Sequence, residues 1–227
     1  DDIRQVLEAA ALPQMKSGAI LIDHTTSSAH LAEDLARQAQ SRNIRFIDAP
    51  VSGGQAGAEN GQLTIMCGGD PQVFAQLNET LFPAYAQSAI YMGKSGQGQR
   101  AKMVNQICIA GVLRGLSEGL LLAQKAELDI PTLVSCLKNG AAGSWQMENR
   151  AQTMCQGPEG KYDFGFAIEW MIKDLGYALD EAEHYGLDLR HGRQTWEEYR
   201  KLAAEGYQCE DTSALLRAVR AQSESAR

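Results

Sequence analysis

A change of pattern at the glycine-rich segment 93–98 constrains the fold of this 227-residue chain more than any other feature. Before it, the apolar runs 19–23 and 44–47 are predicted strands, and the stretch 29–41 between them has a helical period. A strand, a helix and a second strand in this order form a βαβ unit, which predicts a parallel pair in one sheet. The first half is therefore expected to be an α/β domain.

Further elements extend both halves of the chain. Segments 63–67 and 89–92 are predicted strands of the same sheet, with mixed strand directions. After residue 98 no further strand is predicted, so we expect domains at 1–94 and 95–227, the second of them all helical. The predicted helices are 1–12, 29–41, 71–81, 101–128, one that opens at Pro131, 145–153, 168–185, 194–205 and 213–221.

Composition excludes several classes of partner. The chain is 44% hydrophobic and 22% charged, which suits a folded protein with a substantial core. Its net charge of −7 and pI near 5.2 give no attraction for nucleic acid or anionic lipid. The five cysteines are scattered and the four histidines have no ligand-like neighbours, so neither a disulfide framework nor a metal site is predicted. We expect a reduced, cytoplasmic setting and no nucleic-acid or membrane partner.

The most apolar segment, 107–123, is predicted to be a helix inside the protein. Arg114, Ser117 and Glu118 would cost too much in a bilayer. Glycines recur at four-residue spacing along it, at Gly111, Gly115 and Gly119. Small residues at this spacing let other helices approach closely. We therefore expect this helix to be buried on nearly every side, at the centre of a bundle or at a subunit interface.

Ser52, Gly53 and Gly54 follow directly after a predicted strand that ends in Asp-Ala-Pro. The serine supplies a hydroxyl, and the two glycines allow backbone N–H groups to approach a ligand. Together they could hold a small anion such as a carboxylate. Serine and glycine are also common in ordinary turns, which is the alternative on these residues alone.

The chain contains no complete dinucleotide-binding unit of a strand, a G-x-G-x-x-G loop and a helix. Residues 93–98, with the sequence GKSGQG, follow a short strand, and a linker is favoured over a phosphate loop. The sequence begins without Met and inside a helical pattern. We therefore expect that an N-terminal portion is missing and that this chain alone binds dinucleotide weakly and has impaired activity.

Four motifs in order resemble the β-hydroxyacid dehydrogenase family, which includes 3-hydroxyisobutyrate dehydrogenase and tartronate semialdehyde reductase. The motifs are DHTT at 23–26, DAPVSGG at 48–54, GQGQRAKMVNQ at 96–106 and KDL at 173–175. The resemblance covers essentially the whole chain. It implies an α/β fold, the remainder of a Rossmann-type doubly wound sheet followed by an all-helical domain like that of 6-phosphogluconate dehydrogenase. It also implies NAD or NADP as cofactor and a homodimer or homotetramer.

The resemblance assigns Lys102 as the catalytic general acid/base. At the predicted start of a long helix, the helix dipole and partial burial would both disfavour the charged form of this lysine. Asn105 and Gln106 lie three and four residues further on, so all three side chains can share one face of the helix and could contact the substrate. Family members commonly have two asparagines here, and 6-phosphogluconate dehydrogenase has a histidine in place of Asn105. A surface lysine with two surface amides is the alternative.

Other residues take their roles from the same resemblance. Ser52, Gly53 and Gly54 would bind the substrate carboxylate. Thr25 or Thr26 would lie beside the nicotinamide ribose, with capping of the next helix as the alternative. Lys173 would approach the cofactor, with a solvated ion pair as the alternative. A set of large side chains is expected in the helical core rather than around a cofactor, with a place in the lining of the substrate pocket as the alternative for some of them: Trp145, Met147, Phe164, Phe166, Trp170 and Met171.

The sequence thus favours an NAD(P)-dependent oxidoreductase that interconverts a small β-hydroxyacid and its semialdehyde or oxo acid. A non-catalytic scaffold or binding protein on the same fold is one alternative. An imine reductase is another, although imine reductases of this superfamily generally lack the lysine at position 102. The substrate is expected to be a small molecule that carries a carboxylate.

Overall fold

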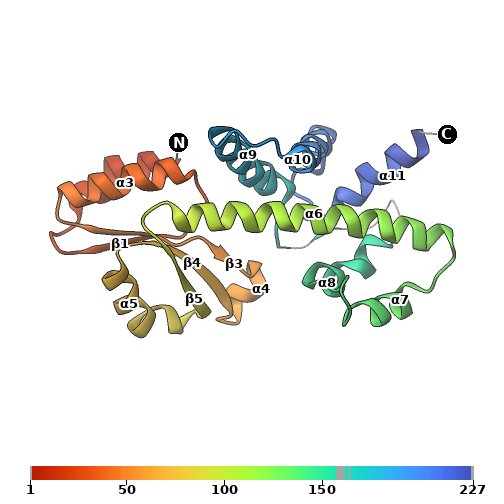
Figure 1. The fold of residues 1–227 in the computed structure, drawn as a ribbon, viewed down its shortest axis with the longest axis horizontal. Helices are drawn as coiled ribbons and strands as arrows, with labels where there is room; N and C mark the ends of the chain where they lie inside the picture. Colours follow the sequence, from red (N-terminus) through yellow and green to blue (C-terminus); the bar gives the residue numbers. More distant parts are fainter. Residues whose placement is uncertain (1, 157–161, 164, 226–227) are drawn as a thin grey trace. The chain divides into compact units, whose positions relative to one another are not determined.

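The computed structural model describes residues 2–156, 162–163 and 165–225 and divides the chain into two compact units, Asp1–Asn105 and Gln106–Arg227. The first unit is a mixed sheet with helices, and the second is helical (Figure 1). This confirms the predicted fold class. The unit boundary falls inside one long helix, α6 (Gln97–Lys125), which runs through both units.

The sheet of the first unit has five strands in mixed directions. β1 (Ile20–Asp23) pairs in parallel with β2 (Arg45–Asp48), and β4 (Leu63–Gly69) pairs in parallel with β5 (Ala86–Gly93). β4 is antiparallel to β2 and to the short strand β3 (Val51–Ser52). The short strand β3 was not predicted, because two residues carry too little periodicity to detect.

Two hydrophobic clusters pack on the sheet. Phe46 lies in a cluster with Leu35 of α3 (Ala29–Ser41), whereas the next residue, Ile47, lies in a cluster with Leu77 of α5 (Pro71–Thr80). Successive strand side chains point to opposite faces, so β2 contributes to both clusters. Figure 1 shows α3 and α5 on opposite sides of the sheet.

Local signals explain where these helices begin. Ser28 caps α3 by accepting the N–H of Leu31, and Asp70 caps α5 by accepting the N–H groups of Gln72 and Val73. The first helical segment continues past its predicted end at residue 12, through α1 (Asp2–Arg4), the π-helical η1 (Gln5–Ala11) and α2 (Leu12–Gln14). The remaining short elements of this unit are α4 (Gly54–Glu59) and η2 (Phe82–Ala84).

The second unit packs its helices around one core that includes Leu113, Met171 and Tyr199. The predicted helices are all present, although α10 begins four residues earlier than predicted. Beside α6, the elements are α7 (Ile130–Leu137), α8 (Trp145–Met154), α9 (Ile168–His184), α10 (Arg190–Leu202), η3 (Ala203–Tyr207), η4 (Thr212–Ala214) and α11 (Leu215–Ser225).

Two expectations about burial in the helical unit were wrong. Met147 and Met171 are in the core as expected, but Trp145 and Trp170 are 57% and 49% exposed. Phe166, from the same set, packs against the core from a partly buried position, and Phe164 lies outside the described residues. Amphipathic helices expose one face, and an aromatic residue on that face looks the same in the sequence as one in the core.

The long helix α6 is buried along one side only, not on nearly every side as predicted. Leu113, Ser117 and Leu120 are buried, whereas Gly111, Gly115 and Gly119 are exposed. By length and composition alone, α6 is the one helix within the described ranges that could cross a membrane. Its buried side nevertheless carries polar groups bonded within the protein. Ser117, for example, donates its hydroxyl to the carbonyl of Leu113, and we treat α6 as a core helix of the fold.

A buried ion pair stabilises the helical unit, and its removal should measurably lower the free energy of unfolding. Arg150 donates through Nε and Nη2 to the Asp211 carboxylate at 2.8 and 2.9 Å, and both side chains are buried. Removing one member leaves an uncompensated buried charge, which typically costs about 3–5 kcal/mol. We expect Asp211→Ala to lower the free energy of unfolding by about that amount in urea titrations. Asp188→Ala, which removes an exposed pair with Arg190, should change it by less than about 1 kcal/mol. Equal effects of the two substitutions would contradict this account.

Candidate active site

The carboxylate of Asp48, at the end of β2, anchors the start of α6. Its Oδ1 accepts the N–H of Gly96 at 2.8 Å, and its Oδ2 accepts the N–H of Gln99 at 3.1 Å. Asp48 is fully buried. Burial raises the pKa of Asp48 above its ordinary value, and the N–H groups of Gly96 and Gln99 offset only part of that rise. Two N–H groups at the start of α6, where no helical carbonyl is available, are thus bonded to a residue of the sheet.

Two glycines make this close approach possible. A Cβ on Gly68 would lie 2.6 Å from Oδ1 of Asp48, and a Cβ on Gly98 would overlap the carbonyl oxygen of Met66. Neither position leaves room for a larger residue without moving the backbone. The glycines therefore bring the first turn of α6 against the ends of β2 and β4.

Gln99 connects the same turn of α6 to the loop after β1. Its Oε1 accepts the N–H of Ser27 at 3.0 Å, and its Nε2 donates to the carbonyl of Thr25 at 2.8 Å. Gln99 is fully buried, so both bonds are shielded from water. The loop that carries Thr25 and Thr26 is thus held against α6. Because Ser28 caps α3, the capping alternative for the two threonines does not apply.

The loop with Ser52, Gly53 and Gly54 leaves the sheet with its glycines in unusual conformations. Ser52 is in β3, paired with Thr64, and its side chain is partly buried. Gly53 and Gly54 have φ values of 131° and 61°, which a residue with a Cβ adopts only with strain, and both are exposed. The loop is therefore open to solvent and built on conformations that require glycine.

His24, the residue after β1, supports the segment that leads into this loop. Its Nδ1 lies 2.6 Å from the carbonyl oxygen of Ala49, which makes Nδ1 the donor, and its Nε2 lies 3.0 Å from the Tyr85 hydroxyl. Ala49 also donates its N–H to the carbonyl of Asp23. Both backbone polar groups of Ala49, just before the Ser52 loop, are thus hydrogen-bonded.

Lys102 lies in the second turn of α6, because the helix begins at Gln97 and not near residue 101 as predicted. The dipole of a helix acts mainly within its first turn. Its effect on Lys102 is therefore weaker than the sequence led us to expect. Lys102 is only 6% exposed, so its side chain is buried. Asn105, three residues further on, is partly buried on the same helix.

Gln106 takes part in a buried polar cluster of the helical unit. Its Nε2 donates to Oδ2 of Asp174 at 2.8 Å, and Oδ1 of Asp174 lies 3.1 Å from the Lys173 ammonium. Gln106 and Asp174 are 1% and 2% exposed, whereas the Lys173 side chain is 41% exposed. The pair of Lys173 and Asp174 is therefore half buried rather than solvated, and Gln106 connects it to α6.

The sequence did not predict the structural roles of Asp48, His24 and Gln99. All three residues lie inside the motifs that carry the family resemblance, although no structural role was predicted for them. The signal that could have identified Asp48 is an acidic residue at the end of a buried strand, followed about fifty residues later by a glycine-rich helix start. Within the described residues, no group of three or more His, Cys, Asp or Glu side chains is arranged to hold a metal ion.

Comparisons with known proteins identify the family. Residues 1–93 match a family described as the NAD binding domain of 6-phosphogluconate dehydrogenase, and residues 96–219 match one described as NAD-binding of NADP-dependent 3-hydroxyisobutyrate dehydrogenase. The chain belongs to the β-hydroxyacid dehydrogenase family. This confirms the resemblance seen in the sequence, with NAD or NADP as the cofactor.

Individual relatives agree with this family assignment. An uncharacterized oxidoreductase of Shewanella frigidimarina is 51% identical over 95% of this chain and 74% of its own length. A probable mitochondrial 3-hydroxyisobutyrate dehydrogenase-like protein of Arabidopsis thaliana is 39% identical over 96% of this chain, which spans 65% of that protein. The structure of Mycobacterium tuberculosis 3-hydroxyisobutyrate dehydrogenase with L-serine has a TM-score of 0.85 and 28% identity, covering 96% of this chain and 76% of that one.

The thiol of Cys67 gives a direct test of how well the Asp48 region is shielded. Burial, and next the nearby negative charge of Asp48, raise the pKa of Cys67 to about 12. Since the thiolate is the reactive form, Cys67 should resist iodoacetamide at pH 8 in the native protein. The exposed residues Cys108, Cys136 and Cys209 should be labelled, and all should react in denaturant. Labelling of native Cys67 as fast as Cys136, measured by peptide mass spectrometry, would refute the shielding.

Proposed function

We propose that the protein is an NAD(P)-dependent dehydrogenase that interconverts a small β-hydroxyacid and its semialdehyde or oxo acid, with Lys102 as the general acid/base. The observation that carries this proposal is the placement of Lys102, nearly buried on a helix whose start is bonded to the ends of β1 and β2 through Asp48 and Gln99. A lysine held in this way is fixed in position, as a general acid/base must be to reach the proton that it transfers.

The substrate hydroxyl would give its proton to Nζ of Lys102, and Asn105 would orient that hydroxyl. When bound, NAD(P) supplies the acceptor for the hydride that leaves the same carbon. Thr25 has an exposed side chain at the carboxyl end of β1, where open α/β sheets bind ligands, so Thr25 and Thr26 are proposed to contact the cofactor. Lys173 is proposed as a further cofactor contact.

Ser52, Gly53 and Gly54 are proposed to bind the substrate carboxylate. The two glycines are exposed and leave the backbone accessible, and the serine hydroxyl can donate to an anion. The related M. tuberculosis enzyme is described with L-serine, which has both a carboxylate and a β-hydroxyl. That combination supports a small β-hydroxyacid as the substrate class here. We also propose a cytoplasmic location and a homodimer or homotetramer.

Gln106 is proposed to act through its neighbours instead of on the substrate. Its amide donates to Asp174, whose other oxygen pairs with Lys173. A glutamine is longer than the asparagine common in the family, and here that length lets α6 reach the Asp174 carboxylate. Gln106 would then position Lys173 toward the cofactor.

The role of Lys102 predicts a specific kinetic change. Lys102→Ala in the full-length enzyme should lower kcat by about 10²–10⁴, the usual contribution of a general acid/base, and leave the KM for NAD(P) nearly unchanged. Lys125→Ala, at an exposed position of the same helix, should retain kcat. Steady-state kinetics with several β-hydroxyacids measures both. An unaltered kcat in Lys102→Ala would remove this residue from the mechanism.

The proposed role of Gln106 predicts different effects on the KM for NAD(P) and on the KM for the hydroxyacid. Gln106→Leu removes the donor to Asp174 and should raise the KM for NAD(P) by about tenfold, the loss of one hydrogen bond to a charged group, with little change in the KM for the hydroxyacid. Ser52→Ala should instead raise the KM for the hydroxyacid and leave the KM for NAD(P) nearly unchanged, because Ser52 belongs to the proposed carboxylate-binding loop. If Gln106→Leu instead raises the hydroxyacid KM alone, Gln106 contacts the substrate.

A further inference from the structure

The ring of Tyr177 lies against Lys173 on one face of α9. The ammonium nitrogen of Lys173 is 5.7 Å from the centroid of the Tyr177 ring. A cation within about 6 Å of an aromatic centroid is attracted to the face of the ring. The two residues are four positions apart, and helical side chains lean toward the N-terminus of their helix, so the Tyr177 ring covers the turn that carries Lys173. The ring therefore restricts where this long, flexible side chain can lie.

Tyr177 has neither a place in the core nor a hydrogen bond in the part of the chain that the structure describes. It is partly buried, but it is not among the side chains that pack against the helical core, as Trp196 does. Its hydroxyl has no hydrogen-bond partner among the described residues. Burial, and next the negative charges of Asp174 and Asp180, raise the pKa of Tyr177, so at neutral pH it is an uncharged phenol. What the ring contributes is its contact with Lys173.

A carboxylate holds the same ammonium from a second side. Oδ1 of Asp174 lies 3.1 Å from Nζ of Lys173, and the other oxygen of this buried carboxylate accepts from Gln106. The Lys173 side chain is still 41% exposed, so a ligand can reach it while both contacts are kept. A free lysine loses much rotamer freedom when a ligand fixes it. A lysine that is held in place beforehand loses less, which strengthens binding.

The main chain beside Lys173 is also fixed. Trp196 of α10 donates its Nε1–H at 2.9 Å to the carbonyl of Ile172, which belongs to the peptide bond between Ile172 and Lys173. The Trp196 ring packs against the helical core, and the Arg200 guanidinium lies 4.6 Å from its centroid. α10 therefore holds the backbone from which the Lys173 side chain extends.

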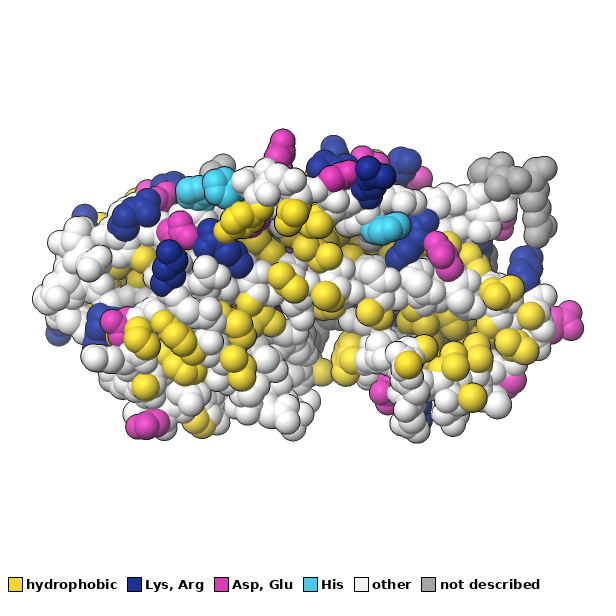
Figure 2. All heavy atoms as spheres, in the orientation of Figure 1, with side chains coloured by type: hydrophobic (Ala, Val, Ile, Leu, Met, Phe, Trp, Pro, Cys, Tyr) yellow, Lys and Arg dark blue, Asp and Glu magenta, His cyan; other side chains and the backbone are white. Residues whose placement is uncertain are grey.

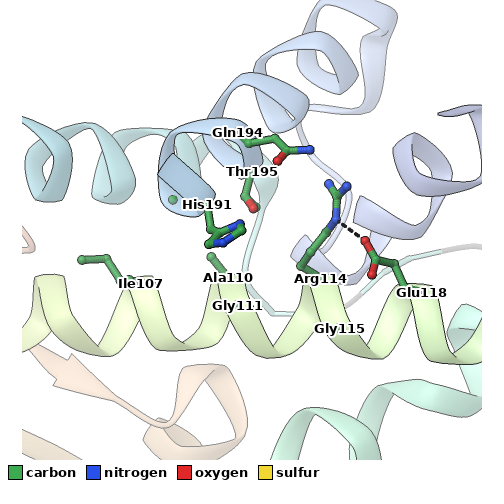
Figure 3. Close-up of a pocket in the computed structure, with 10 residues that line it drawn as sticks. Ile107, Ala110, Gly111, Arg114, Gly115, Glu118, His191, Gln194 and Thr195 are labelled. Atoms are coloured by element: carbon green, nitrogen blue, oxygen red, sulfur yellow. Dashed lines mark hydrogen bonds and ion pairs between the residues drawn. The ribbon is translucent and has the colours of Figure 1, made fainter. Parts of the chain in front are cut away.

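Another face of α10 is directed toward α6. Figure 3 shows the side chains of His191 and Thr195 of α10 directed toward that helix. Three residues after Thr195, the buried carboxylate of Glu198 accepts from Nη1 of Arg114 on α6. Because α6, α10 and α9 are connected in this way, Lys173 extends from packed helices. Helices hold a binding group more precisely than loops do.

The overall charge of the protein does not favour an anionic ligand. The chain has a net charge of −7, and Figure 2 shows Lys and Arg side chains over α10 interspersed with Asp and Glu. Long-range attraction therefore contributes little to binding an anion. An anionic ligand needs a particular cation placed in advance, and Lys173 has the contacts that place one.

We propose that Tyr177 is a positioning residue, whose ring acts with Asp174 to hold the Lys173 ammonium in place for an anionic group of a ligand. This group is either a phosphate of NAD(P) or the carboxylate of the hydroxyacid. The inference rests on the proposed function, in which Lys173 contacts the cofactor, and it adds the residue that orients this lysine.

The test is a double-mutant cycle on Tyr177 and Lys173 in the full-length enzyme. Fluorescence titration gives the Kd for NADH and NADPH, and steady-state kinetics gives kcat and the KM for the hydroxyacid. Tyr177→Leu should weaken binding of the ligand by about two- to fivefold, the strength of a partly exposed cation–π contact, with little change in kcat. Lys173→Met should weaken it by about tenfold or more. In the Lys173→Met background, Tyr177→Leu should have no further effect, because the ring acts through the lysine.

Two further variants separate positioning from packing. Tyr177→Phe keeps the ring and loses only the hydroxyl, so it should bind ligands as the parent enzyme does. Tyr185→Leu, which removes an exposed tyrosine just after α9, is the matched control and should leave both binding constants unchanged. An equal effect of Tyr177→Leu with and without Lys173 would indicate a packing role and overturn the inference. Unchanged binding in Tyr177→Leu would overturn it as well.

The same measurements show which ligand carries the anion. A coupled rise in the Kd for NADH or NADPH assigns it to the cofactor, and a coupled rise confined to the KM for the hydroxyacid assigns it to the substrate. In the second case the positioning role of Tyr177 stands, while the cofactor contact of Lys173 fails. If Lys173→Met binds both ligands as the parent does, the inference and the cofactor contact of Lys173 both fail, and the catalytic role of Lys102 is unaffected.

Discussion

The two hydrogen bonds from the first turn of α6 to the buried carboxylate of Asp48 determine where the rest of the candidate site lies. They hold the N–H groups of Gly96 and Gln99 against the end of β2. A carboxylate at the start of a helix is favoured by the helix dipole and by the unsatisfied N–H groups there. Lys102 follows one turn later, so its position depends on this contact.

The cost of burying Asp48 explains the residues around it. Burial raises the pKa of Asp48, because desolvation opposes its charged form, and the hydrogen bonds from Gly96 and Gln99 act in the opposite direction. Gly68 and Gly98 are required because a Cβ at either position would collide with Asp48 or its neighbours. Gln99 uses the same helical turn to hold the loop after β1. One turn of helix thus connects the segments that carry Thr25 and Lys102.

Sequence reasoning predicted the elements well where periodicity is long. The helices 29–41 and 145–153 and the parallel pair β1 and β2 follow from apolar spacing and from caps such as Ser28. The family resemblance, which the comparisons confirmed, rested on short motifs that include Lys102. The chemical roles of Ser52, Lys102 and Gln106 are predictions, which the kinetics of their variants test.

Other features could not be predicted, for physical reasons. The contact of Asp48 with Gly96 joins residues 48 apart, and no local pattern encodes it. The exposure of Trp170 and of the glycines on α6 depends on which face of each helix meets the core.

Hydrogen exchange at the start of α6 tests the central role of Asp48 most directly. In Asp48→Asn, one acceptor oxygen is replaced by an amide donor, and losing one such bond costs about 1–3 kcal/mol. The account predicts that the amides of residues 96–102 exchange at least tenfold faster in this variant. Asp70→Asn, which alters the equivalent cap of α5, should leave those amides unchanged. Exchange of residues 96–102 at the parent rate in Asp48→Asn would contradict the account.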